Sequence, residues 1–373
     1  MNPPGSATSW RPVQAGLTAA HGGGLGDTLR AVDELLEQTL ERLDADWRAV
    51  AGRRADVLGE QDLPRLAREA AVGGKRMRPA MVHWGWVAAG APAGPHPQVV
   101  QLGAALELVH VFALVQDDVM DHSELRRGQP SVHARSRDLH RASPAQGSSE
   151  EFGKNMAVLV GDLLHSEATL LVAGLPAPVC ETWRTMVVEL VLGQRLDLTG
   201  AAMGRRDITQ AMEVARLKTG TYTIQRPLQM GAQLAGAGDE LVECLLRYGD
   251  HAGKAFGLRD DLLGTFGQPE TTGKSSFDDL EAGKATVLLA LADQRLDERG
   301  RMLLRATGTG SLDRQQLSEL AAMMIDQGVR EEAEQLVVRE VELACAALDT
   351  KVVSPEGIAH LTNEIRRIAW RSS

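Results

Sequence analysis

Apolar residues recur along most of this chain at intervals of three and four positions. Between residues 26 and 50 this spacing is followed by Leu29, Val32, Leu35, Leu36, Leu40 and Leu43. It places them on one face of a helix. The same spacing returns later, in stretches at 98–116, 155–174, 181–198, 208–234, 240–263, 284–294 and 315–348. We find no sustained period of two and no hairpin signal, so the sequence predicts an all-α protein.

Polar and glycine-rich segments interrupt the helical pattern. Residues 1–25 are rich in Gly, Pro, Ser and Ala, which predicts a flexible N-terminal tail before one domain at 26–373. Residues 134–151 end in a run of Ser, Pro, Gln, Gly and Glu, and we expect a polar loop inserted between helices there. A second break is expected from Gly264 to Gly273.

Composition narrows the classes of function. The net charge of −10 at pH 7 argues against a nucleic-acid partner. Three cysteines lie far apart without a CxxC pair, which is typical of a reducing compartment and predicts neither a disulfide framework nor a zinc site. We find no apolar run long enough to span a membrane and no signal peptide, so we expect a cytoplasmic protein with no membrane span.

Two short acidic clusters follow apolar runs. Asp117, Asp118 and Asp121 form the first, and Asp260 and Asp261 form the second. Asp117 and Asp121 are four positions apart, so on a helix they share one face. Two such helices facing each other would offer hard oxygen ligands for Mg²⁺ bound to a diphosphate. The plainer interpretation of either cluster is a solvated helix end.

Cationic motifs accompany the acidic clusters. Arg126-Arg127-Gly128 follows the first cluster, and guanidinium groups bind phosphate oxygens bidentately. The segment from Gly73 to Pro79 places three cations behind a glycine pair, where backbone can approach an anion. Further cations stand in Lys218-Thr219-Gly220, in Gly273-Lys274 and at Lys284. Each motif alone is also typical of a solvated surface.

The order of these motifs is far more specific than any one of them. GGKRMRP, DDVMD, RRG, GQRLD, KTG, RDD, GK and DLEAGK follow one another along the chain. In this order, over about residues 30 to 370, the sequence resembles the trans-isoprenyl diphosphate synthase family, also called polyprenyl synthetases, and most of all its bacterial geranylgeranyl-producing members. The resemblance implies an isoprenoid-synthase-type single-domain helical bundle around a deep central cavity, and a homodimer. It also implies head-to-tail prenyl transfer, in which an allylic diphosphate ionises, isopentenyl diphosphate attacks and a proton is lost.

The resemblance also implies roles for individual residues. Metal ligands, for three Mg²⁺ ions with bound diphosphate, would be Asp117, Asp121 and Asp260. Supporting carboxylates would be Asp118 and Asp261. The allylic diphosphate would be held by Arg126, Lys218, Thr219, Lys274 and Lys284. Isopentenyl diphosphate would be held by Gly74, Lys75, Arg78, His110 and Arg127. The cavity would be lined by Gln194 and Asp197. His110 on an apolar helix could equally be an ordinary core histidine.

Four positions depart from the family pattern. Gln116 stands where many members have His, and Gly257 stands where a Gln that contacts diphosphate is common. Gly264 replaces the last aspartate of the second acidic motif, and Phe277 replaces a frequent Gly. Asp260 is retained, so we expect activity, while the missing Asp and Gln leave diphosphate affinity and metal stoichiometry open.

Product length in this family depends on the residues four and five positions before the first aspartate. Here these are Ala113 and Phe112. Phe112 could simply pack in the core. As a steric stop, a bulky ring at the fifth position beside alanine resembles the pattern of C20 producers. We therefore expect geranylgeranyl diphosphate first and farnesyl diphosphate second.

Two other functions fit parts of the pattern. A class I terpene cyclase ionises a prenyl diphosphate on a similar α fold, but it has no second diphosphate to bind, so the GGKRMR cluster and Arg127 argue against it. A non-catalytic subunit of a heteromeric prenyl synthase would be expected to lose the first acidic motif, which this chain keeps; its altered second motif leaves that reading open.

Overall fold

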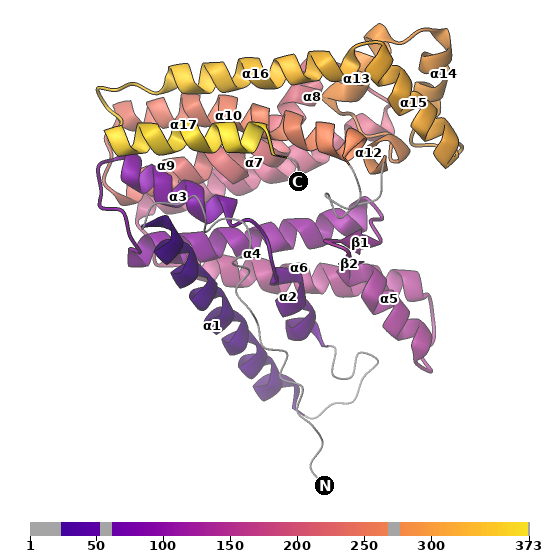
Figure 1. Ribbon diagram of the computed structural model, residues 1–373. Helices are drawn as coiled ribbons and strands as arrows, with labels where there is room; N and C mark the ends of the chain where they lie inside the picture. Colours follow the sequence, from indigo (N-terminus) through magenta and orange to yellow (C-terminus); the bar gives the residue numbers. More distant parts are fainter. Residues whose placement is uncertain (1–23, 53–61, 268–276, 372–373) are drawn as a thin grey trace. The chain divides into compact units, whose positions relative to one another are not determined.

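The computed structural model describes residues 24–52, 62–267 and 277–371, and it confirms the all-α prediction (Figure 1). The predicted tail lies outside the described residues up to residue 23. The helices of the described residues are α1 (Leu25–Ala51), α2 (Leu63–Ala71), α3 (Met77–Ala88), α4 (Pro97–Met120), α5 (Val132–Ala142), α6 (Ser149–Ala173), α7 (Ala177–Ala202), α8 (Ile208–Val214), the π-helix η1 (Ala215–Gln225), α9 (Arg226–Leu234), α10 (Asp239–Phe266), α12 (Asp278–Glu281), α13 (Val287–Arg295), α14 (Glu298–Ala306), α15 (Arg314–Asp326), α16 (Val329–Ala347) and α17 (Pro355–Ala369).

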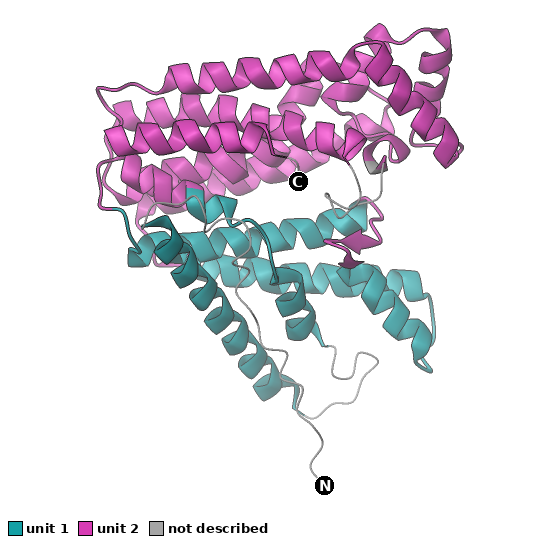
Figure 2. Cartoon of the chain, in the orientation of Figure 1, with its two compact units in different colours: residues 1–80, 93–120, 131–171 teal, residues 81–92, 121–130, 172–373 magenta. Residues whose placement is uncertain are grey.

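The chain forms two compact units (Figure 2). Unit 1 takes its described residues from 1–80, 93–120 and 131–171, and unit 2 from 81–92, 121–130 and 172–373. The first acidic cluster is divided by this boundary, because Asp117 and Asp118 belong to unit 1 and Asp121 belongs to unit 2.

Helix α4 is the core of unit 1. Its residues from Leu102 to Val109 are all buried, including Glu107. Helices α1, α2 and α5 pack against it. Gly103 allows α1 to come close, since a Cβ at this position would lie 2.9 Å from Cγ2 of Val32. A helix that is apolar on most of its faces is expected at the centre of a unit.

Two helices are long and apolar enough to cross a membrane by length and composition, α4 and α6. The expectation that no apolar run reaches this length was therefore wrong, because each helix has an 18-residue window with few charges. In α4, 67% of that window is buried, and in α6, 33%. Core helices of globular proteins meet the same criterion, so length and composition alone do not assign a membrane span.

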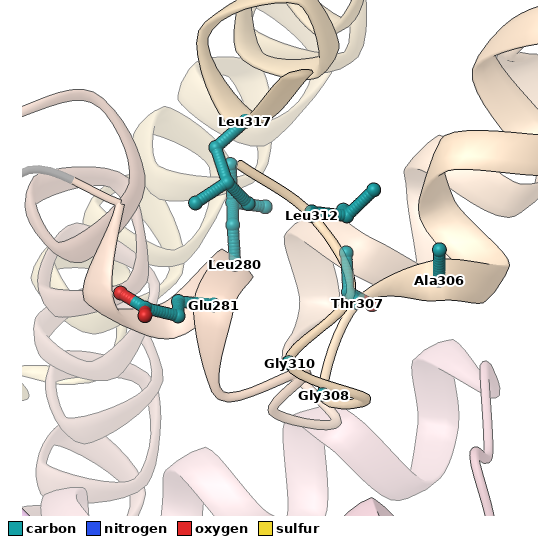
Figure 3. A pocket seen from close by; sticks show the side chains of 8 residues that line it. All are labelled: Leu280, Glu281, Ala306, Thr307, Gly308, Gly310, Leu312 and Leu317. Atoms are coloured by element: carbon teal, nitrogen blue, oxygen red, sulfur yellow. The ribbon is translucent and has the colours of Figure 1, made fainter. Parts of the chain in front are cut away.

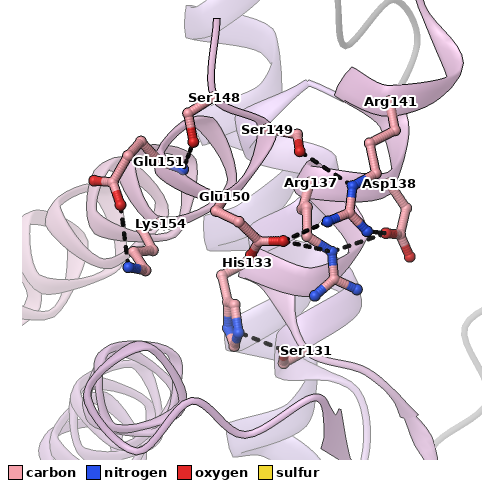
Figure 4. Close-up of polar contacts among 10 residues, drawn as sticks. All are labelled: Ser131, His133, Arg137, Asp138, Arg141, Ser148, Ser149, Glu150, Glu151 and Lys154. Atoms are coloured by element: carbon pink, nitrogen blue, oxygen red, sulfur yellow. Dashed lines mark hydrogen bonds and ion pairs between the residues drawn. The ribbon is translucent and has the colours of Figure 1, made fainter.

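The polar loop predicted at 134–151 is mostly helical. Helix α5 covers residues 132–142 and α6 begins at Ser149. The buried face of α5 consists of His133, Ala134, Ser136 and His140, so it has almost no apolar residue to reveal the helical period. Arg141 of α5 pairs with Glu150 and donates to Ser149 Oγ at 3.1 Å, which ties the two helices together (Figure 4).

Unit 2 is built around α10, which packs against η1, α9, α16 and α17. Small residues let η1 approach α10 closely. A Cβ at Gly220 would lie 2.7 Å from Cα of Gly253, and a Cβ at Gly257 would lie 2.9 Å from Cβ of Ala215. The family's Gln would not fit at position 257 without moving η1, which gives a physical reason for that departure.

Unit 2 also contains a small hairpin that the sequence pattern did not predict. Strand β1 (Leu125–Arg126) pairs antiparallel with β2 (Gln129–Pro130). The two turn residues, Arg127 and Gly128, have φ of 53° and 73°, as a type I′ turn requires. Two-residue strands are too short to show a period of two.

The remaining boundaries differ in detail. The stretch predicted at 315–348 is two helices, because Gly328 adopts φ of 78° between α15 and α16. The predicted break from Gly264 begins late, since α10 continues to Phe266. The rest of that break, residues 268–276, lies outside the described residues.

Candidate active site

The second acidic cluster stands in the last turns of α10. The side chain of Asp260 is 46% exposed, and its carboxylate pairs with Arg371 at the end of the described chain. The guanidinium of Arg371 also lies 4.2 Å from the centre of the Phe256 ring. Arg371 belongs to no motif in the sequence, so its pairing with a predicted metal ligand could not be foreseen.

Asp261 is a partly buried neighbour. Desolvation by burial, with the charges of Asp279 and Asp260, holds the pKa of Asp261 well above its usual range. The Val287 N–H donates to its carboxylate at 3.4 Å and opposes this rise. A carboxyl in this setting favours a partner cation or a proton.

Lys284 joins the end of the first acidic motif to the DLEAGK segment. Its Nζ lies 2.8 Å from Oδ2 of Asp121 and 3.4 Å from Oδ1 of Asp279. The three side chains are between 12% and 21% exposed. The sequence motifs singled out Lys284 and Asp121 but gave no role to Asp279, although it opens DLEAGK.

Lys218 lies on η1, and its Nζ donates to Asp197 of α7 at 2.6 Å. A Cβ at Gly193 would lie 2.4 Å from the Lys218 backbone nitrogen. The glycine of GQRLD therefore brings η1 against α7, and its aspartate pairs with the lysine of KTG. Thr219 and Gln194 are both partly exposed. Long π-helical segments are rare and often mark functional sites.

In unit 1, Asp117 and Asp118 occupy the last turn of α4. Asp118 is buried and Asp117 is partly exposed. One turn earlier, the ring of Phe112 lies edge-on to His165 of α6, with ring centres 5.0 Å apart. Gly161 of α6 leaves room for this ring, because a Cβ there would lie 3.3 Å from Phe112 Cδ2. Ala113 is partly exposed.

The hairpin presents the arginine pair in two different settings. Arg126 is partly buried on β1, whereas Arg127 is exposed in the turn. The two neighbouring arginines therefore differ in backbone setting and in exposure.

The three cations of the GGKRMRP segment differ sharply. Lys75 is exposed and Arg78 is buried. Arg76 is buried and bonded within unit 1, where it donates to Asp33 at 2.7 Å, to Glu107 at 2.9 Å and to the Gly73 carbonyl at 2.7 Å. Arg76 therefore holds the loop, while Gly73 and Gly74 supply φ of 81° and 105°. His110 is partly exposed on α4.

Lys274 lies outside the described residues. Within the described ranges, no group of three or more His, Cys, Asp or Glu side chains is arranged to hold a metal ion by itself. Carboxylates that bind Mg²⁺ commonly share the ion with substrate phosphates and water, so fewer protein ligands are needed at each ion.

A separate hollow of about 170 Å³ lies beside α12 and α14 (Figure 3). Its lining is mainly apolar or glycine, including Leu280, Leu312 and Leu317, with Glu281 as its charged member. None of the predicted site residues lines it, and it is smaller than typical ligand pockets.

Comparison with known proteins supplies the family. Residues 60–324 match polyprenyl synthetase. Geranylfarnesyl diphosphate synthase of Aeropyrum pernix is 31% identical over 278 residues, which cover 70% of this chain and 79% of the relative. A (2E,6E)-farnesyl diphosphate synthase of Mycobacterium bovis is 33% identical, with 70% and 68% covered.

Solved structures agree with the sequence relatives. Geranylgeranyl pyrophosphate synthase from Corynebacterium glutamicum, complexed with isoprenyl diphosphate and magnesium, aligns with a TM-score of 0.85 and 33% identity. The alignment covers 93% of this chain and 99% of that one. The chain therefore belongs to the polyprenyl synthetase family and is a prenyltransferase of isoprenoid biosynthesis.

Proposed function

We propose that this protein is a short-chain trans-prenyl diphosphate synthase that condenses isopentenyl diphosphate with an allylic diphosphate and releases geranylgeranyl diphosphate. The observation that carries the proposal is the contact of Lys284 with Asp121 and Asp279. This contact joins the first acidic motif to the last cationic motif. Such a pair of lysine and carboxylate is expected at a place where a metal-bound diphosphate would come between the two groups. Family membership and relatives named as C15, C20 and C25 synthases support the reaction class.

The available ligands fit Mg²⁺. Asp117, Asp121 and Asp260 offer hard carboxylate oxygens, and the latter two are paired with cations that a metal ion could replace. Solved neighbours were crystallised with magnesium or calcium and isoprenyl diphosphate. Bound Mg²⁺ would neutralise the charge that develops on the departing diphosphate. Three ions are proposed by analogy with the family.

The protein's own cations would complete this neutralisation. Arg126, Lys218, Thr219 and Lys284, with Lys274, would hold the allylic diphosphate while its carbon–oxygen bond breaks. Gly74, Lys75, Arg78, His110 and Arg127 would orient isopentenyl diphosphate, so that its double bond attacks the allylic carbon. The proton lost from the new chain would pass to the released diphosphate, since no His or Glu stands out as a base.

Phe112 would set the product length. Its ring is fixed against His165 and Gly161, so it could stop a growing chain one helical turn below Asp117. Phe112→Ala should shift the main product from C20 to longer prenyl diphosphates, as resolved by chain-length chromatography. His165→Ala is a matched variant that should lengthen the product less, because it removes only the support of the ring. Unchanged products from Phe112→Ala would exclude Phe112 as the stop.

We also propose a cytoplasmic homodimer. Helix α7 carries an apolar stripe of Val188, Val191 and Leu192, which are 60%, 58% and 39% exposed. Contiguous exposed apolar stripes are typical of protein interfaces, and isologous dimers are the commonest oligomers. The three cysteines, which form no disulfide, support a reducing compartment. Light scattering after size-exclusion chromatography would give the mass of the assembly.

Incubation of the purified protein with Mg²⁺, isopentenyl diphosphate and C5, C10 or C15 allylic primers tests the reaction. A C20 diphosphate is the expected product. A cyclic hydrocarbon from the allylic substrate alone would identify a cyclase instead. Absence of turnover with every primer would indicate a subunit whose second acidic motif has lost its function.

A further inference from the structure

The turn that follows α14, residues 307–313, packs against the DLEAGK loop, residues 279–284. The Gly308 N–H donates to the Glu281 carbonyl at 3.1 Å. A Cβ at Gly283 would lie 2.8 Å from both Cα and the nitrogen of Gly308. The two glycines have positive φ, 61° and 75°. Glycine at both positions therefore lets the turn and the loop meet backbone to backbone.

Side chains leave this contact partly unfilled. Leu280 and Glu281 of the loop and Thr307 and Gly308 of the turn all line the hollow beside α12 and α14 (Figure 3). An unfilled space forfeits the dispersion contacts that would otherwise hold its walls. The backbone contacts of Gly308 therefore have a larger share in fixing the position of the loop.

Thr307 ties the turn to the segment that precedes α8. Its side chain is buried, and its hydroxyl accepts from Nη2 of Arg206 at 3.3 Å and donates to the Leu304 carbonyl at 2.7 Å. Burial lowers the pKa of Arg206, although the charge of Asp293 opposes this shift. A desolvated guanidinium gains from each acceptor that it finds, so this contact should hold the turn in place.

The DLEAGK loop ends in Lys284, next to Gly283. The Lys284 N–H donates to the Asp279 carbonyl at 3.1 Å, and its own carbonyl accepts from the Thr286 N–H at 2.9 Å. The backbone of the lysine is thus fixed within the loop, and its Nζ lies 2.8 Å from Oδ2 of Asp121. A shift of Gly283 would therefore move the lysine with it.

Resting on the proposed function, we infer that Thr307 and Gly308 are positioning residues for the reaction. They support the DLEAGK loop from the α14 side and so set the place of Lys284 against the diphosphate. Neither residue belongs to the motifs that the sequence singles out. Their effect on rate would come through the lysine, since misplacing a reacting or stabilising group by about 1 Å can cost on the order of 10²-fold.

Replacing Gly308 tests the support directly. A Cβ there would lie 3.2 Å from the Ala282 carbonyl oxygen, so Gly308→Ala should displace the loop. We expect kcat to fall about tenfold while KM for the allylic substrate changes less than about threefold, because Lys284 would stabilise the departing diphosphate more than the bound one.

Gly310→Ala is the matched control. Gly310 lies in the same turn with φ of 69°, and a Cβ there would meet no atom of the described chain within 4 Å. The variant carries the same backbone strain without pressing on the DLEAGK loop, so it should keep the parent's kcat. Melting without ligands compares the loss of stability in the two variants.

Replacing Thr307 tests the other side of the turn. Thr307→Val keeps the shape but removes the acceptor for Arg206, and should lower kcat about threefold, the equivalent of one hydrogen bond. Thr307→Ser keeps the hydroxyl and should restore the parent's kcat. A role in folding alone would make kcat of the remaining folded protein the same in both variants.

A double-mutant cycle with Lys284→Met shows whether Gly308 acts through the lysine. In that background, Gly308→Ala should lower kcat/KM less than about twofold further, since the group to be positioned is gone. A second readout needs no turnover: the Mg²⁺ midpoint for thermal stabilisation in the presence of inorganic diphosphate. Gly308→Ala should raise this midpoint, and Gly310→Ala should leave it unchanged.

Equal kcat in Gly308→Ala and Gly310→Ala, or full additivity of Gly308→Ala with Lys284→Met, would overturn the positioning role. A protein that makes no prenyl diphosphate but shows the expected pattern of Mg²⁺ midpoints would instead overturn the proposed reaction and leave the support of the loop standing.

Discussion

Two charge clusters, one around Arg76 and one around Lys284, are each centred on a cation from a sequence motif, but they have different roles. In unit 1, Arg76 contacts Asp33 and Glu107, and the three side chains are between 3% and 15% exposed. In unit 2, Lys284 contacts Asp121 and Asp279 at 12% to 21% exposure. Both clusters place one cation between two carboxylates, and Arg76 also donates to the Gly73 carbonyl.

The difference shows which charges are fixed and which are exchangeable. Burial, with a smaller contribution from the charge of Glu107, raises the pKa of Asp33 although Arg76 acts to lower it. The Arg76 cluster is therefore desolvated and must stay paired. A lysine is a flexible point charge, whereas the arginine fork is rigid and bidentate. The Lys284 cluster can therefore open for a metal-bound diphosphate, and the Arg76 cluster cannot open without cost to the fold.

Replacing Arg76 gives the largest expected effect. Arg76→Met leaves Glu107 buried without its cation, which should lower the free energy of unfolding by about 3–5 kcal/mol. Denaturant unfolding measures this change. The exposed pair of Lys154 with Glu151, at 3.1 Å, is the control, and Lys154→Ala should cost at most about 1 kcal/mol. A small effect for Arg76→Met would remove the distinction between the clusters.

Replacing Lys284 should affect turnover rather than stability. Lys284→Met should reduce kcat/KM for the allylic substrate by about 10²–10³-fold, as for loss of one group that stabilises developing negative charge. The free energy of unfolding should change by no more than about 1 kcal/mol. Lys254→Met is the control, since Lys254 pairs with Asp250 at 2.6 Å at similar exposure. A decrease in the free energy of unfolding as large as that of Arg76→Met would show that Lys284 has a structural role instead.

Replacing Arg371 should have a smaller effect, and it should strengthen metal binding rather than weaken the site. Its guanidinium pairs with Asp260, so it competes with any metal ion that this carboxylate would bind. Arg371→Gln should tighten Mg²⁺ binding by up to about fivefold, the equivalent of a partly exposed ion pair. Calorimetric titration with Mg²⁺ and inorganic diphosphate would measure it. Weaker binding would mean that Arg371 assists the metal site instead.

The sequence predicted the features that leave a regular apolar period or an ordered set of charged motifs. The period of 3.6 predicted the long apolar helices, and the order of the acidic and basic motifs predicted the family. Helix α5 was missed because His133, Ser136 and His140 form its buried face, and an apolar period cannot reveal such a face. Arg371 reaches the site through tertiary folding, and its spacing from the motifs carries no sign of that contact. Asp279 opens DLEAGK, but the motif alone does not show that its carboxylate lies beside Lys284.

The role of Arg76 was hidden for the same reason. The motif GGKRMRP presents three cations that look alike, but only folding brings Asp33 and Glu107, 43 and 31 residues away, to one of them. The turn at Arg127 and Gly128 was also hidden, because only the second of these two residues is of a type that a type I′ turn favours.

The smallest expected effect contrasts backbone strain in the two clusters. Arg76 and Phe277 both have positive φ, 49° and 71°, a region that costs residues other than glycine about 1–3 kcal/mol. The three hydrogen bonds of Arg76 offset this cost, whereas the aromatic side chain of Phe277, two residues before Asp279, is of a type that rarely adopts this conformation. Phe277→Gly, the residue frequent in the family, should therefore raise the free energy of unfolding by about 1 kcal/mol after loss of its partly buried ring. Arg76→Gly, the matched change in the Arg76 cluster, should instead lower the free energy of unfolding, and by several times that amount. Denaturant midpoints of both variants decide the point, and a loss of stability on Phe277→Gly would show that the ring contributes more to packing than its backbone costs.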